Sequence, residues 1–141
     1  MKARLAAIHG SRYPARFAGE RWRVKVLIAD DDRLVRAMLG DLLAELGHVV
    51  VSAGDGAEAV TLCDREPPDL LILDFLMPRL SGLDALRDIR RRHAIPALLL
   101  TAINQGSLRG VEGVEQVQGT LEKPFTRKAL ERAIGKAVPG R

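Results

Sequence analysis

The side chains best suited to chemistry stand where short apolar runs of the sequence end. Asp30 and Asp31 close the first such run, Asp74 the third, Thr101 the fourth and Lys123 the fifth. A carboxylate nucleophile, a hydroxyl and an ammonium group are the protein groups that phosphoryl transfer uses. If the five runs are neighbouring strands, the pattern predicts a phosphoryl-transfer site at their carboxyl ends.

The acidic residues also predict a divalent cation. Three carboxylates that converge cannot all stay ionised unless a cation lies between them. Because Asp30, Asp31 and Asp74 offer only oxygen, with no His or Cys beside them, the ligand set favours a hard ion such as Mg²⁺.

Each of these residues also has an ordinary structural interpretation. Asp31 or Asp32 is suited to cap the helix that follows, and Asp74 to a turn at a strand end. Thr101 is a common strand residue, and Lys123 a common surface residue. The chemical interpretation rests on all of them occurring at successive strand ends.

The elements that must position these residues follow from the hydrophobic pattern. Strands are predicted at Val24–Ala29, His48–Ala53, Asp69–Leu73, Pro96–Leu100 and Val117–Glu122. Helical segments separate them, and a last helix is predicted over Thr126–Val138. Strands that alternate with helices predict an α/β fold, a doubly wound five-stranded parallel sheet with helices on both faces.

Two helices carry more specific expectations. Leu34, Met38, Leu42 and Leu46 recur every four residues and are interpreted as one helix stripe. Residues 103–118 contain Gly106, Gly110 and Gly113, each of which costs about 1 kcal/mol in a helix interior. A fourth helix there is expected to be short, distorted or absent.

The composition limits the remaining possibilities. Residues 1–23 contain six of the 22 Lys and Arg but one of the 18 Asp and Glu, so they are interpreted as a basic flexible arm before a near-neutral domain at 24–138 and a tail at 139–141. No apolar run approaches the ~20 residues that a membrane helix needs. Cys63 is the one cysteine and is expected to be a buried apolar residue in a cytoplasmic protein. The basic run 90–93 is interpreted as the solvated end of a helix.

At this point the sequence resembles the receiver domains of bacterial two-component response regulators. The resemblance is carried by four stretches in the expected order and covers 24–138. They are VLIADDD (26–32), LILDFLMP (71–78) with Gly82, LTA (100–102) and KPF (123–125). It implies a flavodoxin-like strand order 2-1-3-4-5 and a CheY-like site.

The resemblance also implies residue roles. Asp74 would accept the phosphoryl group, and Asp30, Asp31, Asp74 and the backbone carbonyl of Leu76 would hold Mg²⁺. Thr101 would act as the switch, and Lys123, with a cis bond to Pro124, would pair with Asp74. The donor would be a phosphohistidine on a sensor histidine kinase or a histidine phosphotransfer protein, docking on the first helix at Arg33, Leu34 and Ala37.

One departure from the family concerns the output. Many receivers have an aromatic residue three positions before the lysine, whereas this chain has Thr120. Together with the Gly-rich stretch, this places the usual route of signal output in doubt.

These observations leave three hypotheses. The first is a stand-alone receiver with no DNA-binding domain after Val138, a stoichiometric phosphoacceptor that signals by protein contact and is not an enzyme. The second is a pseudo-receiver that binds a partner without using phosphate. The third, an Asp-dependent phosphatase, usually needs a second acid where this chain has Leu76.

Overall fold

Five parallel strands form the centre of the molecule, in the order β2-β1-β3-β4-β5. The computed structural model describes residues 23–102 and 105–138. The strands are β1 (Lys25–Ala29), β2 (Val49–Ala53), β3 (Leu70–Asp74), β4 (Ala97–Thr101) and β5 (Gly119–Glu122). The predicted fold class and strand order are therefore confirmed.

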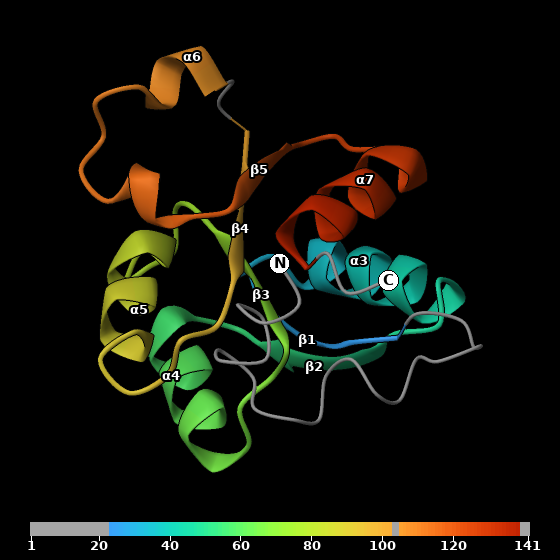
Figure 1. The fold of residues 1–141 in the computed structure, drawn as a ribbon, viewed down its shortest axis with the longest axis horizontal. Coiled ribbons are helices and arrows are strands. Elements are labelled where there is room, and N and C mark those ends of the chain that lie inside the picture. Colours follow the sequence, from blue (N-terminus) through green and yellow to red (C-terminus); the bar gives the residue numbers. More distant parts are fainter. Residues whose placement is uncertain (1–22, 103–104, 139–141) are drawn as a thin grey trace.

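Helices cover both faces of this sheet, as Figure 1 shows. They are α3 (Arg33–Glu45), α4 (Gly56–Arg65), α5 (Gly82–Ile89), α6 (Gln105–Leu108) and α7 (Arg127–Ala137), with the 3₁₀ helix η1 at Val114–Gln116. α3 and α7 pack on one face around Leu43, Ile72 and Ile134, and α4 and α5 pack on the other around Cys63, Leu71 and Leu86. The core is aliphatic on both sides.

The strand register brings the predicted site residues to one edge. Ala29 is paired with Leu73, so Asp30 and Asp74 follow at the same level of neighbouring strands. On the next pair of strands, Thr101 at the end of β4 is paired with Glu122 at the end of β5. Lys123 directly follows Glu122 and so lies at the same edge of the sheet. Because the chain leaves β1 for β2 on one side and returns to β3 on the other, these ends lie at the switch point where such sheets bind ligands.

The predicted stripe on the first helix is wrong at its N-terminal end. Leu39 and Leu43 are fully buried and Leu46 nearly so, whereas Leu34 is 79% exposed and Met38 47% exposed. An α-helix has 3.6 residues per turn, so each four-residue step rotates the side chain by about 40° further around the axis. Residues at strict four-residue spacing therefore leave the core face within three steps.

The segment between β4 and β5 contains little regular structure, as its glycines predicted. α6 has four residues and η1 three. Gly110 and Gly113 have φ angles of 86° and 94°, which end any helix at those points. Leu108 is buried beside Leu83 and Leu99 and fixes this connector to the sheet.

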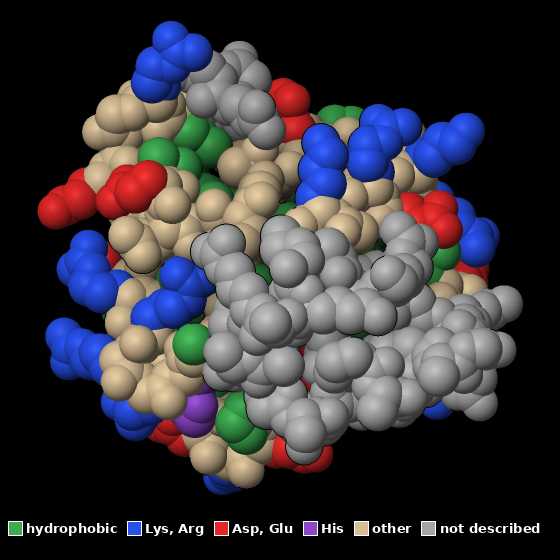
Figure 2. Space-filling view, in the orientation of Figure 1, with side chains coloured by type: hydrophobic (Ala, Val, Ile, Leu, Met, Phe, Trp, Pro, Cys, Tyr) green, Lys and Arg blue, Asp and Glu red, His purple; other side chains and the backbone are tan. Residues whose placement is uncertain are grey.

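The basic run after α5 does not form a uniformly solvated end. The Arg90 guanidinium donates to the carbonyls of Ile95 and Gln116 and to the side-chain oxygen of Gln118, at 2.9–3.0 Å. Arg91 is exposed, and Figure 2 shows Lys and Arg side chains gathered over α5 and α7. The sequence interpretation is therefore wrong for Arg90, because residues distant in the sequence supply its partners.

The predicted arm lies outside the described residues except for Arg23, as does the tail at 139–141. Cys63 is buried on α4, where burial raises the pKa of its thiol to about 12, as expected for an unreactive core residue. In the described part of the chain, no helix has the length and apolar character to cross a bilayer.

Candidate functional site

Three carboxylates meet at the carboxyl ends of β1 and β3. One oxygen from each of Asp30, Asp31 and Asp74 lies within 4.8 Å of the others. Asp30 and Asp74 are buried, and Asp31 is exposed to solvent. The cluster therefore has a fixed, desolvated side and an open side through which an ion or a phosphate can enter.

The structure divides the roles of the three consecutive aspartates. Asp32 caps α3, because its carboxylate accepts from the backbone N–H groups of Leu34 (2.9 Å) and Val35 (3.4 Å). The Oδ1 atom of Asp30 accepts from the N–H of Asp32 at 2.8 Å, which fixes the Asp30 side chain. The capping interpretation is thus correct for Asp32, and Asp30 and Asp31 belong to the acidic cluster.

Lys123 connects two of the three acids. Its ammonium lies 3.1 Å from Oδ2 of Asp30 and 3.3 Å from Oδ1 of Asp74. Its backbone N–H donates to the Thr101 carbonyl at 2.7 Å, and the bond to Pro124 is cis, as the resemblance implied. Oδ2 of Asp30 receives no well-aligned hydrogen bond from the described residues, so its contact with Lys123 is ionic and leaves acceptor capacity for a cation.

The electrostatics of the cluster fit a cation site. Burial, and then the charge of Asp30, raise the pKa of Asp74 to about 6 even though Lys123 acts in the opposite direction. For Lys123, burial lowers the pKa, but the contacts with Asp30 and Asp74 outweigh it and the net pKa is raised. One ammonium contacts only two of the three carboxylates, so their negative charge is not fully neutralised, and an oxygen-binding divalent ion such as Mg²⁺ fits the cluster.

Thr101 and Leu76 are the two predicted site residues outside the acidic cluster and Lys123. Thr101 is buried at the last position of β4. Leu76 is in the loop between β3 and α5 and is 65% exposed. The switch role of Thr101 and the metal-binding role of the Leu76 carbonyl stay predictions.

Two glycines fix the loop that contains Leu76. A Cβ on Gly82 would lie 2.2 Å from the backbone oxygen of Asp74, and a Cβ on Gly56 would lie 2.6 Å from the backbone oxygen of Leu80. Real Cβ atoms do not approach oxygen so closely. The start of α5 and the start of α4 are therefore packed directly against the two ends of the loop.

Comparison with known proteins identifies the family. Residues 26–135 match the response regulator receiver domain family. The chain belongs to this family. The matched residues include the acidic cluster and Lys123.

Individual relatives agree with this assignment. The transcriptional regulatory protein PdtaR of Mycobacterium tuberculosis is 41% identical over 115 residues, which are 81% of this chain and 56% of PdtaR. This chain spans about half the length of the curated relatives that it matches.

Solved structures extend the comparison. The chemotaxis protein CheY4 of Vibrio cholerae has a TM-score of 0.76 and 27% identity, covering 82% of this chain and 98% of CheY4. The receiver domain of the sensor histidine kinase PA1611 from Pseudomonas aeruginosa has a TM-score of 0.74 and 28% identity, with coverages of 82% and 98%. That structure has a magnesium ion coordinated in its active-site cleft.

The predicted docking residues lie on the open side of the receiver site. Arg33, Leu34 and Ala37 are exposed on the first turns of α3, which begins two residues after Asp31. Leu34 and Met38, one helical turn apart on α3, are both exposed apolar side chains. Whether a phosphodonor uses this surface stays a prediction.

Sequence reasoning did not assign a specific contact to Arg36. Its guanidinium donates to the backbone carbonyl of Asp30 at 2.6 Å and so fixes the end of β1. Asp30 and Arg36 are six residues apart in the sequence, and only the turn into α3 brings them together. The sequence signal for this contact was the position of Arg36, in the first two turns of the helix that follows the acid at the end of a strand.

Proposed function

We propose that this receiver domain accepts a phosphoryl group on Asp74 in two-component or phosphorelay signalling, with Mg²⁺ as cofactor. The observation that supports this most strongly is the group of three carboxylates within 4.8 Å, two of them in contact with Lys123. Asp30, Asp31, Asp74 and the carbonyl of Leu76 would hold the ion. When bound, Mg²⁺ supplies positive charge to the phosphoryl oxygens during transfer.

The residues of the chain then have distinct tasks. A carboxylate oxygen of Asp74 attacks the phosphorus, the P–N bond of a phosphohistidine breaks, and its electron pair stays on the imidazole nitrogen. Lys123 already lies 3.3 Å from Asp74 and is placed to pair with a phosphoryl oxygen. Thr101 offers a hydroxyl at the same edge, and its reorientation toward the phosphoryl group would be the switch.

The donor would be a sensor histidine kinase or a histidine phosphotransfer protein. Docking would use the exposed start of α3, where Arg33, Leu34 and Ala37 lie beside the open side of the acidic cluster. We place this exchange in the cytoplasm, which fits the single, buried thiol of Cys63. The domain would act as a stoichiometric acceptor and not as an enzyme with turnover of a separate substrate.

The downstream signal would pass by protein contact. A cavity of about 520 Å³ lies along β5 and α7 and is lined by Thr120, Phe125 and Ala133 among others. Thr120 supplies no ring to fill it. The alternative is a pseudo-receiver that uses such a surface without phosphate, and the short fourth helix is the observation that favours it.

Acetyl phosphate with Mg²⁺, followed by intact-mass measurement, tests the proposal. The wild type is expected to gain about 80 Da, one phosphoryl group. Asp74→Asn, or omission of Mg²⁺, abolishes the gain, and Asp41→Asn, an exposed acid on α3, is the control that keeps it. If the wild type forms neither this adduct nor a beryllofluoride complex, the pseudo-receiver hypothesis replaces the proposal.

A further inference from the structure

A strained turn lies in the loop between Asp74 and α5. The φ angle of Arg79 is 70°, and it is the one non-glycine residue with positive φ in the described part of the chain. The N–H of Leu80 donates to the carbonyl of Pro78 at 2.7 Å. A hydrogen bond from residue i+2 to residue i around a positive φ defines the rare, strained form of the γ-turn. Arginine has no intrinsic preference for this backbone conformation.

The side chain of Arg79 is held by an acid that is itself fixed. Its guanidinium donates to Oδ2 of Asp55 at 2.8 Å. Oδ1 of Asp55 accepts from the N–H of Glu58 at 2.8 Å and so caps α4. Glu58 in turn accepts from the N–H of Gly54, the residue before this N-cap, at 2.7 Å. The two oxygens of Asp55 therefore join the γ-turn to the start of α4.

This contact adds an anchor to the middle of the loop. Near its ends, the N–H of Gly82 donates to the Phe75 carbonyl at 3.2 Å and the Leu80 carbonyl packs against Gly56. Arg79 is three residues after Leu76. The conformation of the loop backbone decides whether the Leu76 carbonyl points toward the acidic cluster or away from it. Strained turns persist only where surrounding contacts determine them, and they concentrate at functional sites.

We propose that Arg79 is a positioning residue for the cation site: through Asp55 it holds the γ-turn, and with it the loop backbone at Leu76, in the conformation that binds Mg²⁺. This inference rests on the proposed function, because it concerns the same ion. The competing explanation is an ordinary exposed ion pair, since the Arg79 side chain is 73% exposed and such pairs contribute little to stability.

The sign of the effect on Mg²⁺ affinity separates the two explanations. Arg79→Ala removes a positive charge from the loop that follows Asp74, so electrostatics alone would leave Mg²⁺ binding unchanged or strengthen it. Loss of loop position would weaken it. Second-layer residues of metal sites typically contribute 10–100-fold to affinity. For this exposed contact we expect about threefold to tenfold weaker binding.

Three variants and one control define the experiment. Arg79→Ala keeps the unfavourable backbone conformation and loses the ion pair, whereas Arg79→Gly loses the pair but adopts positive φ freely. Asp55→Asn retains the helix cap and loses the charge. Arg92→Ala is the matched control, because Arg92 pairs with Asp64 at 2.9 Å and joins α5 to α4 at the ends remote from the site.

The measurement is the Mg²⁺ dissociation constant from a backbone-amide NMR titration with MgCl₂ alone, together with the thermal midpoint without Mg²⁺. We expect weaker binding in Arg79→Ala, partial recovery in Arg79→Gly, and no change in Arg92→Ala. Asp55→Asn should weaken binding to a similar degree, because it breaks the same ion pair. Unchanged or tighter binding in Arg79→Ala, while the wild type binds Mg²⁺, overturns this inference alone. A wild type that binds no Mg²⁺ overturns the proposed function with it.

Discussion

The acidic edge of the sheet and the connector between β4 and β5 are built in opposite ways. At the edge, two buried acids lie within 3.3 Å of one ammonium, and Gly82 packs against the backbone oxygen of Asp74 without room for a methyl group. The connector contains four residues of α6 and three of η1, and no heavy atom lies within 4 Å of a Cβ added to Gly110. Figure 1 shows it extending away from the sheet beside β4.

This difference shows which part of the fold the proposed chemistry needs. Asp30, Asp74 and Thr101 are at or directly after strand ends, and Lys123 is held by a backbone hydrogen bond to β4. None of these residues is on the connector. A receiver site can therefore be complete while the fourth helix is reduced to a single turn, and the reduction affects the surfaces available to partners.

Glycine substitutions in the two regions give the largest expected contrast. Gly82→Ala should lower the free energy of unfolding by about 3 kcal/mol, because the new methyl group must displace backbone of the acidic site. In Gly110→Ala the new methyl group has open space around it, so the free energy of unfolding should fall by only about 1 kcal/mol, mainly because alanine disfavours a φ of 86°. Urea unfolding of the two variants measures both values. Equal losses would contradict the contrast between a packed site and an open connector.

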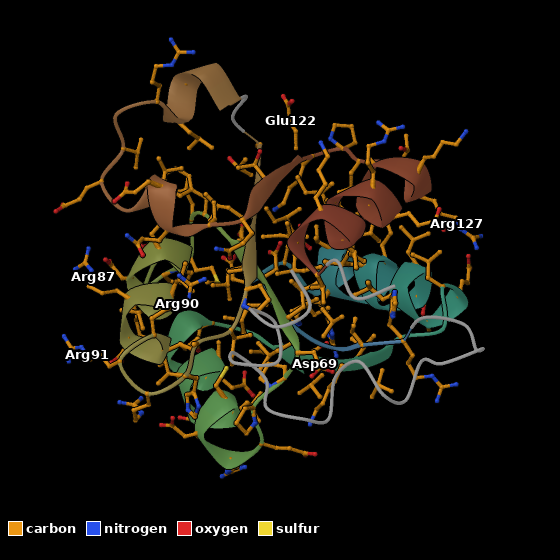
Figure 3. The ribbon with its side chains drawn as sticks, in the orientation of Figure 1. Asp69, Arg87, Arg90, Arg91, Glu122 and Arg127 are labelled. Atoms are coloured by element: carbon orange, nitrogen blue, oxygen red, sulfur yellow. The ribbon has the colours of Figure 1, made fainter. Side chains whose placement is uncertain are left out.

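Arg90→Met tests what holds the connector. The substitution keeps the apolar part of the side chain but removes donors to the carbonyls of Ile95 and Gln116. Arg90 directly follows α5, and Figure 3 labels it together with Arg87 and Arg91. We expect a loss of about 2 kcal/mol, with faster hydrogen exchange at residues 113–118 and no change in β1 and β3. Arg91→Met, in which an exposed side chain is replaced, is the control. Faster exchange in β1 or β3 would show that the two regions are coupled.

Asp74→Asn should stabilise the metal-free protein in a pH-dependent way. The folded pKa of about 6 exceeds the ordinary value of 3.8, so protonation of Asp74 favours the folded state. This contribution is fully present below pH 3.8 and is lost as the pH rises through 6. At pH 7 we expect the free energy of unfolding of Asp74→Asn to be about 1–2 kcal/mol higher than that of the wild type, since partial solvation reduces the full effect of the pKa shift.

The pH profile supplies the control for this prediction. The advantage of the variant should shrink toward zero near pH 4, where the wild-type carboxyl is already neutral when the protein is folded. Thermal unfolding of both proteins without divalent ions, from pH 4 to pH 8, measures the difference. An advantage that is constant across this range would show that the charge of Asp74 is not its cause.

The fold could be predicted from the sequence because its signals are local. Apolar runs such as residues 70–73 and 97–100 are buried on both faces, and a run of this kind predicts a central parallel strand without knowledge of its neighbours. The same runs end in the site residues. A single repeating pattern, a polar residue after a buried strand, therefore indicated both the sheet and its acidic edge.

The features that were missed depend on partners distant in the sequence. The interactions of Arg90 with Gln116 and of Arg79 with Asp55 join residues 24 or more positions apart, and arginine at these positions predicts only a solvated side chain. The burial of α3 was misjudged for a geometrical reason, because strict four-residue spacing drifts around the helix. For the two arginines, by contrast, tertiary contacts decide the environment, and no periodicity in a single sequence contains them.

Location of the phosphoryl group within the chain tests the account most directly. The protein would be treated with acetyl phosphate and Mg²⁺, reduced with borohydride, which converts an aspartyl phosphate to homoserine, and then digested and sequenced by mass spectrometry. The account predicts homoserine at position 74, and at no other Asp, in the wild type. Homoserine at Asp30 or Asp31, or an adduct on Asp74 that forms equally well without Mg²⁺, would contradict it.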